Sequence, residues 1–532
     1  MRTTTTLFWL ALAALPALAC GDSTLIGDCG RQPDIACTDE CGDPLALECN
    51  EGNWICPAVP AFACEECGPL PGGLDCIDAC GDFYGPSCVG GSWICEDVAV
   101  DCPDDPELKA AEWSDSFGSH GFEEVEHVAM DDEGNVYIAV RFRESLELDP
   151  GTSVDSTGGY DALVAKYDAA GRRVWQQSFG GVGDELPHGL ELNPAGELVL
   201  LLSESDVNTG NPPKAGPASL VRLGVDDGGL LGSLPLGYDL GYADVDALAI
   251  HPVDGTIVLT GEFAGDLSWN GPTLSAAGER DVYVLAIDGA GNHLWSRSLG
   301  GSGYDDVVGI DIDDQGNVLL AGAFGTPVTI DELTLEAAGY AMSLGSDGQL
   351  QWATSLAGAQ TVVGDIRGYG DGGAIVSAAF DGQASLGAFD LSASSPELEG
   401  LVARLGPEGD VVFVRAQGPV RSTGSFAQTH DWFVGVDASG DVLIAGSAFS
   451  GGNDQDVLVG RLDPQTGEPR WQQAYGDDNS NFVGGAVSRD GSLIVVGSFF
   501  GSMDVGNGML DGYIEGAGFV ALFSTEAPPE AL

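Results

Sequence analysis

The chain has 532 residues, 80 of them glycine, and a formal charge of −63 from 82 acidic and 19 basic side chains. Its length exceeds the usual size of one hydrophobic core, so several folding units or a repeat architecture are expected. Nucleic acid is excluded as a partner, because the sequence has no cluster of Lys or Arg that could displace counterions from a phosphate backbone.

The first twenty residues have the layout of an export signal. Arg2 precedes an apolar stretch from Leu7 to Leu18 that is too short to span a membrane. The sequence Ala-Leu-Ala-Cys that ends at Cys20 resembles a bacterial lipobox. This resemblance implies that residues 1–19 are a removed signal peptide and that Cys20 becomes an acylated N-terminus on a tether over 20–28. The alternative is ordinary signal-peptidase cleavage, with Cys20 left as a spare thiol.

The next segment carries a dense set of cysteines. Apart from Cys20, the chain has twelve cysteines, all before residue 103. The middle four of the first six cysteines recur with the same spacing 39 residues later. Even, dense cysteines in an exported segment indicate disulfides, which stabilise modules too small for a core of their own. We predict two Cys-rich modules, 29–66 and 67–102, of undetermined pairing. Their cysteines are Cys29, Cys37, Cys41, Cys49, Cys56 and Cys64, then Cys67, Cys76, Cys80, Cys88, Cys95 and Cys102.

Two alternatives concern these modules. Zinc would suit thiolates at short spacing, but the intervals differ from those of zinc knuckles and no His lies between residues 21 and 102. Trp54 and Trp93 are interpreted as apolar plugs of the modules, with sugar stacking as the other interpretation.

After a linker over 103–110, residues 111–526 carry a sevenfold repeat. A phrase with Trp before a glycine-rich stretch recurs, as in WSDSFGSHG from Trp113, with weaker copies from Leu231 and Phe413. Each unit also contains an Asp/Asn/Gly turn followed by an apolar strand, for example the one that begins at Asp313. A further apolar strand follows in each unit, for example the one that begins at Asp281. With the apolar stretch after each glycine-rich phrase, each unit has four strands. We therefore predict an all-β fold, a seven-bladed β-propeller of four-stranded antiparallel blades.

The register of the repeat predicts how the ring closes. The chain enters on the Trp113 phrase, which is the fourth strand of a blade, and leaves on a third strand, GFVALF from Gly518. The seventh blade is complete only if the Trp113 segment supplies its last strand, which would also remove exposed sheet edges. Residues 527–532 are predicted to be a disordered tail.

The repeats resemble those of β-propellers in secreted bacterial lipoproteins. RLDPQTGEPRW, which ends at Trp471, is similar to the tryptophan-docking repeats of PQQ-enzyme-like propellers. The resemblance implies packing between blades, with Leu231 and Phe413 in the docking position of the two weaker units. No sign of a quinone site accompanies it, so dehydrogenase activity is not implied. The residues that match the docking position are Trp113, Trp175, Trp295, Trp352 and Trp471.

One face of the ring is the predicted binding face. Connections between second and third strands run to about 20 residues in several units, and long loops on a rigid scaffold are where binding usually resides. The glycine-rich connections emerge on the same face and add the candidate acids Glu123, Glu124, Asp184, Glu185, Asp305, Asp306, Asp477 and Asp478. A Ca²⁺ site is the sharpest hypothesis that these carboxylates allow, although no loop has the complete EF-hand pattern, and no other cofactor is expected. Asp131, Asp132, Asp313 and Asp314 are interpreted as turn formers.

No catalytic residues are predicted, since the six histidines lack the H-E-x-x-H spacing and no G-x-S-x-G elbow occurs. The sequence predicts a monomeric lipoprotein of the bacterial cell envelope, at the outer membrane or cell surface, held by acyl chains at Cys20. Its propeller would be a non-catalytic binding or scaffolding platform for a protein or glycan. The alternatives are a hydrolase or lyase with an active site in the central funnel, and a structural envelope-assembly factor.

Overall fold

The described part of the computed structural model consists of strands, turns and bends. It comprises eight short strands between residues 37 and 94, and residues 110–118, 122–149, 151–205, 218–237, 242–358, 361–393, 398–420, 432–437, 439–451, 454–476, 481–489, 492–512 and 516–524. Among these residues, none forms a helix long and apolar enough to cross a membrane. The chain divides into two compact units, Met1–Pro103 and Asp104–Leu532.

The first unit contains antiparallel hairpins that repeat along the chain. Each strand of the first module has a counterpart 39 residues later, so the sequence repeat is present in the backbone. The strand pairs are β1 (Cys37–Thr38) with β2 (Pro44–Leu45), β3 (Glu48–Asn50) with β4 (Asn53–Ile55), β5 (Cys76–Ile77) with β6 (Phe83–Tyr84), and β7 (Ser87–Val89) with β8 (Ser92–Ile94).

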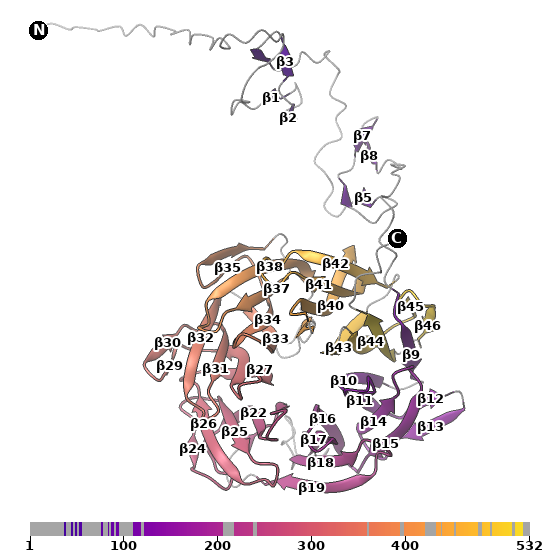
Figure 1. Cartoon of the computed structure of the whole chain (residues 1–532), viewed down its shortest axis with the longest axis vertical. Coiled ribbons are helices and arrows are strands. Elements are labelled where there is room, and N and C mark those ends of the chain that lie inside the picture. The colour runs from indigo at the N-terminus through magenta and orange to yellow at the C-terminus, as the bar shows by residue number, and fades with distance from the viewer. Residues whose placement is uncertain are drawn as a thin grey trace, which may run out of the picture. The chain divides into compact units, whose positions relative to one another are not determined.

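The second unit is a seven-bladed β-propeller, which confirms the predicted fold (Figure 1). The first three blades are β10 (Phe122–Met130), β11 (Val136–Arg143), β14 (Asp161–Tyr167) and β15 (Arg173–Phe179); β16 (Asp184–Leu192), β17 (Glu197–Ser205), β18 (Ala218–Gly224) and β19 (Leu230–Leu236); and β20 (Tyr242–Ala243) with β21 (Ala247–Ile250), β22 (Ile257–Ala264), β25 (Asp281–Ile287) and β26 (His293–Leu299).

The remaining blades follow the same order from the axis outward. They are β27 (Asp305–Ile312), β28 (Val318–Phe324), β31 (Gly339–Leu344) and β32 (Leu350–Gly358); β33 (Thr361–Tyr369), β34 (Gly373–Phe380), β37 (Leu398–Leu405) and β38 (Val411–Val420); β39 (Trp432–Val436), β40 (Val442–Gly451), β41 (Asp454–Leu462) and β42 (Pro469–Tyr475); and β43 (Asn481–Arg489), β44 (Ser492–Phe499), β47 (Ala517–Ser524) and β9 (Trp113–Phe117).

The hydrophobic core lies between neighbouring blades. Val282 and Val284 of the third blade pack with Leu320 and Met342 of the fourth, and all four are inaccessible to solvent. Burial of each such side chain contributes about 1.5–3 kcal/mol. Because every blade is covered on both faces, third strands such as β14 are buried along their whole length and appear in the sequence as short, nearly continuous apolar runs.

The turns between first and second strands depend on an aspartate side chain. Asp313 Oδ1 accepts hydrogen bonds from the backbone N–H groups of Gln315 and Asn317, at 2.9 and 2.8 Å. Asp131 accepts the same bonds at 3.1 and 2.8 Å. This confirms the turn-former interpretation of both residues. Asp132 and Asp314 are exposed beside them.

The outer strand of a blade packs against a turn of the next blade. A Cβ added to Gly228, Gly348 or Gly409 would lie 2.6, 2.8 or 2.9 Å from the ring of Trp175, Trp295 or Trp352. Each of these glycines has a φ between 67 and 79°, which residues with a side chain rarely adopt. The glycine therefore allows both the turn and the contact with the Trp ring, which we call the joint between the blades. In the same way, a Cβ added to Gly171 would lie 2.5 Å from the ring of Trp113 in β9.

Two weaker units depart from this pattern. Phe413 lies against Gly467, as a substitute for Trp should. The assignment of Leu231 was wrong, because its side chain is 52% exposed. Gly232 occupies the register position, and Leu234, two residues on, reaches Gly291 instead. Trp471 packs into the core between the sixth and seventh blades.

The seventh blade combines strands that lie far apart in the sequence. β47 pairs antiparallel with β9, with Gly518 opposite Phe117 and Leu522 opposite Trp113. The N–H of Glu112 donates to Leu522 O at 2.7 Å, which extends the ladder by one residue.

Five connections between second and third strands are themselves hairpins, which the four-strand repeat did not predict. They lie at the outer rim of the ring rather than over its axis (Figure 1). The sequence predicts loops at these positions. They are β12 (Ser145–Asp149) with β13 (Thr152–Asp155), β23 (Asp266–Leu267) with β24 (Leu274–Ser275), β29 (Val328–Ile330) with β30 (Leu333–Leu335), β35 (Gln383–Leu386) with β36 (Phe389–Ser392), and β45 (Ser502–Asp504) with β46 (Met509–Asp511).

Candidate functional site

Several acids of the predicted binding face hold the glycine-rich connections in place. Asp305 is fully buried, and its carboxylate accepts the N–H groups of Gly301 and Gly325 at 2.7 and 3.0 Å. Glu185 is buried and accepts the N–H of Gly181 at 2.6 Å. Burial raises the pKa of both carboxyls, against the opposing pull of these N–H donors. Their role in the structure is therefore to order the loops.

The other acids of that set have different surroundings. Glu123 is buried, and Glu124 forms an ion pair with Arg141. Asp184 accepts the N–H of Tyr160 at 2.9 Å. Asp477 and Asp478 lie outside the described residues, as do Cys20 and all predicted disulfide cysteines except Cys37, Cys49, Cys76 and Cys88, which lie in β1, β3, β5 and β7.

A groove of about 490 Å³ opens where the first blade meets the second. Its lining combines glycine backbone, one aromatic ring and charged side chains. Arg143 and Arg141 both lie against the Tyr160 ring, with guanidinium carbons 5.6 and 5.1 Å from its centroid. Gly158 allows close packing, because a Cβ there would lie 2.5 Å from Gly181 O. The lining residues are Arg143, Glu144, Ser156, Gly158, Gly159, Tyr160 and Asp184.

Titratable groups surround Arg141, which lies next to this groove. Glu126 Oε1 is 3.1 Å from Arg141 Nε, and burial raises the pKa of Glu126 to about 7 despite the arginine. His188 Nε2 lies 2.7 Å from Ser203 Oγ. Burial lowers the pKa of His188 to about 4, and the positive charge of Arg141 acts in the same direction. The imidazole is therefore neutral at pH 7.

A related arrangement occurs between the third and fourth blades. Arg280 pairs with Glu262 at 2.8 Å and donates to Tyr304 Oη at 2.7 Å. Burial and the negative charge of Glu262 raise the pKa of Asp306 to about 7. Arg280 precedes the first residue of a third strand, as Tyr160 does in the first blade, so equivalent positions carry different chemistry in the two blades.

Three charged residues share one register position on the inner strands. Glu191, Asp311 and Arg367 are each the partner of the second residue of the apolar run in the next strand. Arg367 pairs with Asp365 at 2.8 Å, and Asp311 accepts the N–H of Gly368 at 2.7 Å. Burial raises the pKa of Glu191 to about 7, which the positive charge of Arg367 opposes. Sequence reasoning missed this set, since only the strand pairing brings the positions into line.

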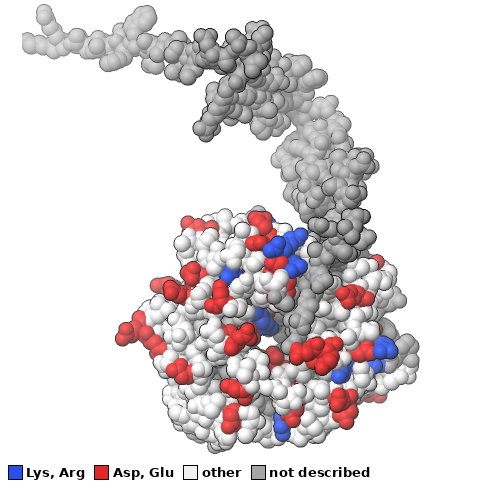
Figure 2. Space-filling model, in the orientation of Figure 1, with Lys and Arg blue, Asp and Glu red and all other residues white. Residues whose placement is uncertain are grey.

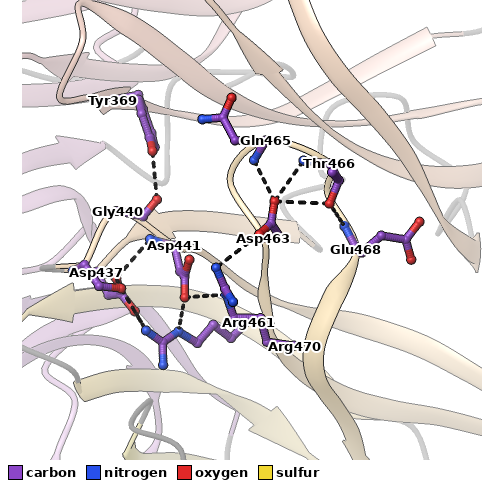
Figure 3. A network of polar contacts seen from close by, with 11 residues as sticks. Tyr369, Asp437, Gly440, Asp441, Arg461, Asp463, Gln465, Thr466, Glu468 and Arg470 are labelled. Atoms are coloured by element: carbon purple, nitrogen blue, oxygen red, sulfur yellow. Dashed lines mark hydrogen bonds and ion pairs between the residues drawn. The ribbon is translucent and has the colours of Figure 1, made fainter.

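Acidic side chains are spread over the visible face of the propeller, with few basic ones among them (Figure 2). Among the described residues, no group of three or more His, Cys, Asp or Glu could hold a metal ion. Arginines elsewhere are neutralised, as in the sixth blade, where Arg461 contacts Asp437 and Asp441 at 2.9 and 2.8 Å and Arg470 contacts Asp441 and Asp463 at 2.7 and 3.1 Å (Figure 3).

No family model and no curated protein matches the sequence. Solved structures with a similar fold include the Dos1 propeller (12% identity, TM-score 0.41, 79% of this chain and 98% of that one). Others are the quinohemoprotein alcohol dehydrogenase from Comamonas testosteroni (11%, 0.37, 81% and 79%) and puromycin hydrolase (13%, 0.44, 78% and 57%). At these values the likeness carries no conclusion about function, and the fold of the chain is described by its own seven blades.

Proposed function

We propose that the propeller is a non-catalytic binding platform for a glycan or a protein, and that the groove of the first blade is its recognition site. The groove has the volume of a small-ligand site and is built on a rigid ring. Among the described residues, the Arg143 guanidinium contacts no carboxylate, although the chain has 82 acidic residues. A basic group left available in so acidic a protein supports binding in this groove.

The test is capture by the full chain immobilised on beads, compared with Arg143→Ala. We expect the wild type to retain a defined glycan or protein without altering it, and the variant to retain at least tenfold less, since a lost charged hydrogen bond costs about 1.5–3 kcal/mol. Equal retention by both proteins would remove the groove from the proposal. Chemical conversion of the captured molecule would favour an enzyme.

One contact supports the second candidate, a hydrolase. Ser203 Oγ lies within hydrogen-bond distance of a neutral His188, as a nucleophile and its base would. The low pKa makes His188 a weak base, and Ser203 is only 9% exposed, so the contact fits a structural role better. Hydrolysis of ester or glycoside substrates by the wild type and its loss in Ser203→Ala would reverse this ranking.

We further propose that the chain is exported and held in the cell envelope by acyl chains at Cys20, with the Cys-rich modules as a disulfide-bonded spacer and with no cofactor. The lipobox-like sequence and the odd cysteine count support this. An alkyne-labelled fatty acid should be incorporated by the wild type and not by Cys20→Ala; labelling of both would contradict it. The alternative is a structural role in envelope assembly, in which the propeller binds no soluble ligand.

The pairing of β47 with β9 leads to one more proposal, that the propeller is sealed by its own two ends. Deletion of β9 tests this proposal, and it should leave the propeller unable to fold stably.

A further inference from the structure

Four of the rim hairpins begin with the same turn. In the third, fifth and seventh blades the turn residue is a glycine with positive φ: Gly265 (78°), Gly382 (58°) and Gly501 (80°). The carbonyl of each accepts one closing hydrogen bond, from Ala276, Ala393 and Gly512 at 2.8, 2.8 and 2.7 Å. The three turns are therefore equivalent in both conformation and bonding.

The first blade has Glu144 at this position. Its φ is 72°, and its carbonyl accepts the N–H of Ser156 at 2.7 Å, so the turn is the same one. The left-handed conformation costs free energy for any residue with a Cβ and almost none for glycine. Three internal copies show that glycine satisfies the fold here, so Glu144 is retained against a conformational cost. Such outliers tend to occur where a side chain has a function.

Glu144 lines the groove together with Arg143 and Tyr160. Glu144 is exposed, and among the described residues its carboxylate contacts no hydrogen-bond donor. Two consecutive lining residues thus carry a carboxylate with free acceptors and a guanidinium with free donors. A sugar hydroxyl both donates and accepts, so two adjacent hydroxyls match this pair of groups. Because the two charges balance, a neutral ligand can satisfy both.

We propose that this groove binds a neutral saccharide, with Glu144 accepting from and Arg143 donating to a pair of adjacent hydroxyls. This inference rests on the proposed function of the groove and names its ligand. It also predicts that Glu144 lowers stability while it enables binding.

The experiment compares Glu144→Gly with Glu332→Gly in the full chain. Glu332 is a matched control, since it is exposed, has a φ of 78° and lies in the β29–β30 turn outside the groove. Both variants should melt about 1–2 °C higher than the wild type, because both lose a strained residue. Only Glu144→Gly should lose at least tenfold in saccharide affinity. Glu144→Gln, which keeps the shape of the side chain, should lose less.

Binding is measured by saturation-transfer NMR and titration calorimetry with glucose, galactose, mannose and N-acetylglucosamine as probes. Alanine, a zwitterion, and lysine, a cation, serve as charged probes. Saccharide binding by the wild type and by Glu332→Gly, lost in Glu144→Gly, supports the proposal. Three results overturn it: equal binding by Glu144→Gly, binding of the amino acids alone, or no binding of any probe. Capture of a protein that depends on Arg143 but not on Glu144 would leave the platform function standing while this inference fails.

Discussion

Deletion of residues 110–117 from the full chain should leave the propeller unable to fold stably. The deletion removes β9, the fourth strand of the seventh blade, and exposes the edge of β47, whose Phe519 and Val520 are inaccessible to solvent. It also removes Trp113, which stacks on Tyr167 at 5.9 Å and packs against Gly171. Loss of the buried Phe117 alone costs about 3–5 kcal/mol, and the total should exceed that.

The measurements are thermal unfolding followed by circular dichroism, and gel filtration. We expect a melting temperature at least about 10 °C lower, together with aggregation through the free strand edge. Deletion of residues 103–109, which removes a similar length of chain from the linker, is the control and should change neither property. A monomeric Δ110–117 protein with unaltered melting would show that the ring does not need its two ends joined.

The blades could be predicted because each repeats the same physical requirements. A side-chain-capped turn such as that of Asp313, a buried strand such as β25 and a docking Trp each leave a local signal, and seven copies make the signal unmistakable. The assignment of Leu231 to the docking position was wrong because the sequence alone does not fix the position of a residue along its strand. In the strand pairing Gly232 is opposite Arg222, the position that Trp175 has opposite Lys166 in the first blade, and Leu234 contacts Gly291 instead.

The site was less predictable, because its properties depend on contacts between distant segments. Asp305 and Glu185 were predicted in the glycine-rich connections, but they lie at the start of the inner strands β27 and β16, and sequence could not show that backbone N–H groups already occupy their carboxylates. Conversely, nothing local distinguishes Glu144 from the other 81 acidic residues. The available signal is the comparison with Gly265, Gly382 and Gly501, and this comparison requires the rim hairpins, for which the sequence predicts loops.

The joint between outer strands and turns leads to the second large effect, which is expected for Gly348→Val. The new Cβ would lie 2.8 Å from Trp295 Cε3, in a turn whose φ of 79° is unfavourable for a β-branched residue. The clash would also disturb two bonds at the joint, Trp295 Nε1–H to Ser346 O at 2.8 Å and Arg297 to Gly348 O at 2.7 Å. We expect the free energy of unfolding, measured by denaturant titration, to fall by about 3–5 kcal/mol, as for other severe packing changes.

Gly196→Val separates the two contributions to this loss. Gly196 has nearly the same φ, 72°, but a Cβ there would meet nothing within 4 Å. It should therefore lose only the conformational part, about 1–2 kcal/mol. If docking is the larger part, Trp295→Ala should partly rescue Gly348→Val, so that the double variant is more stable than the sum of the single losses predicts. Equal losses in the two glycine variants, or strict additivity in the double variant, would mean that the Trp joint contributes little to holding neighbouring blades together.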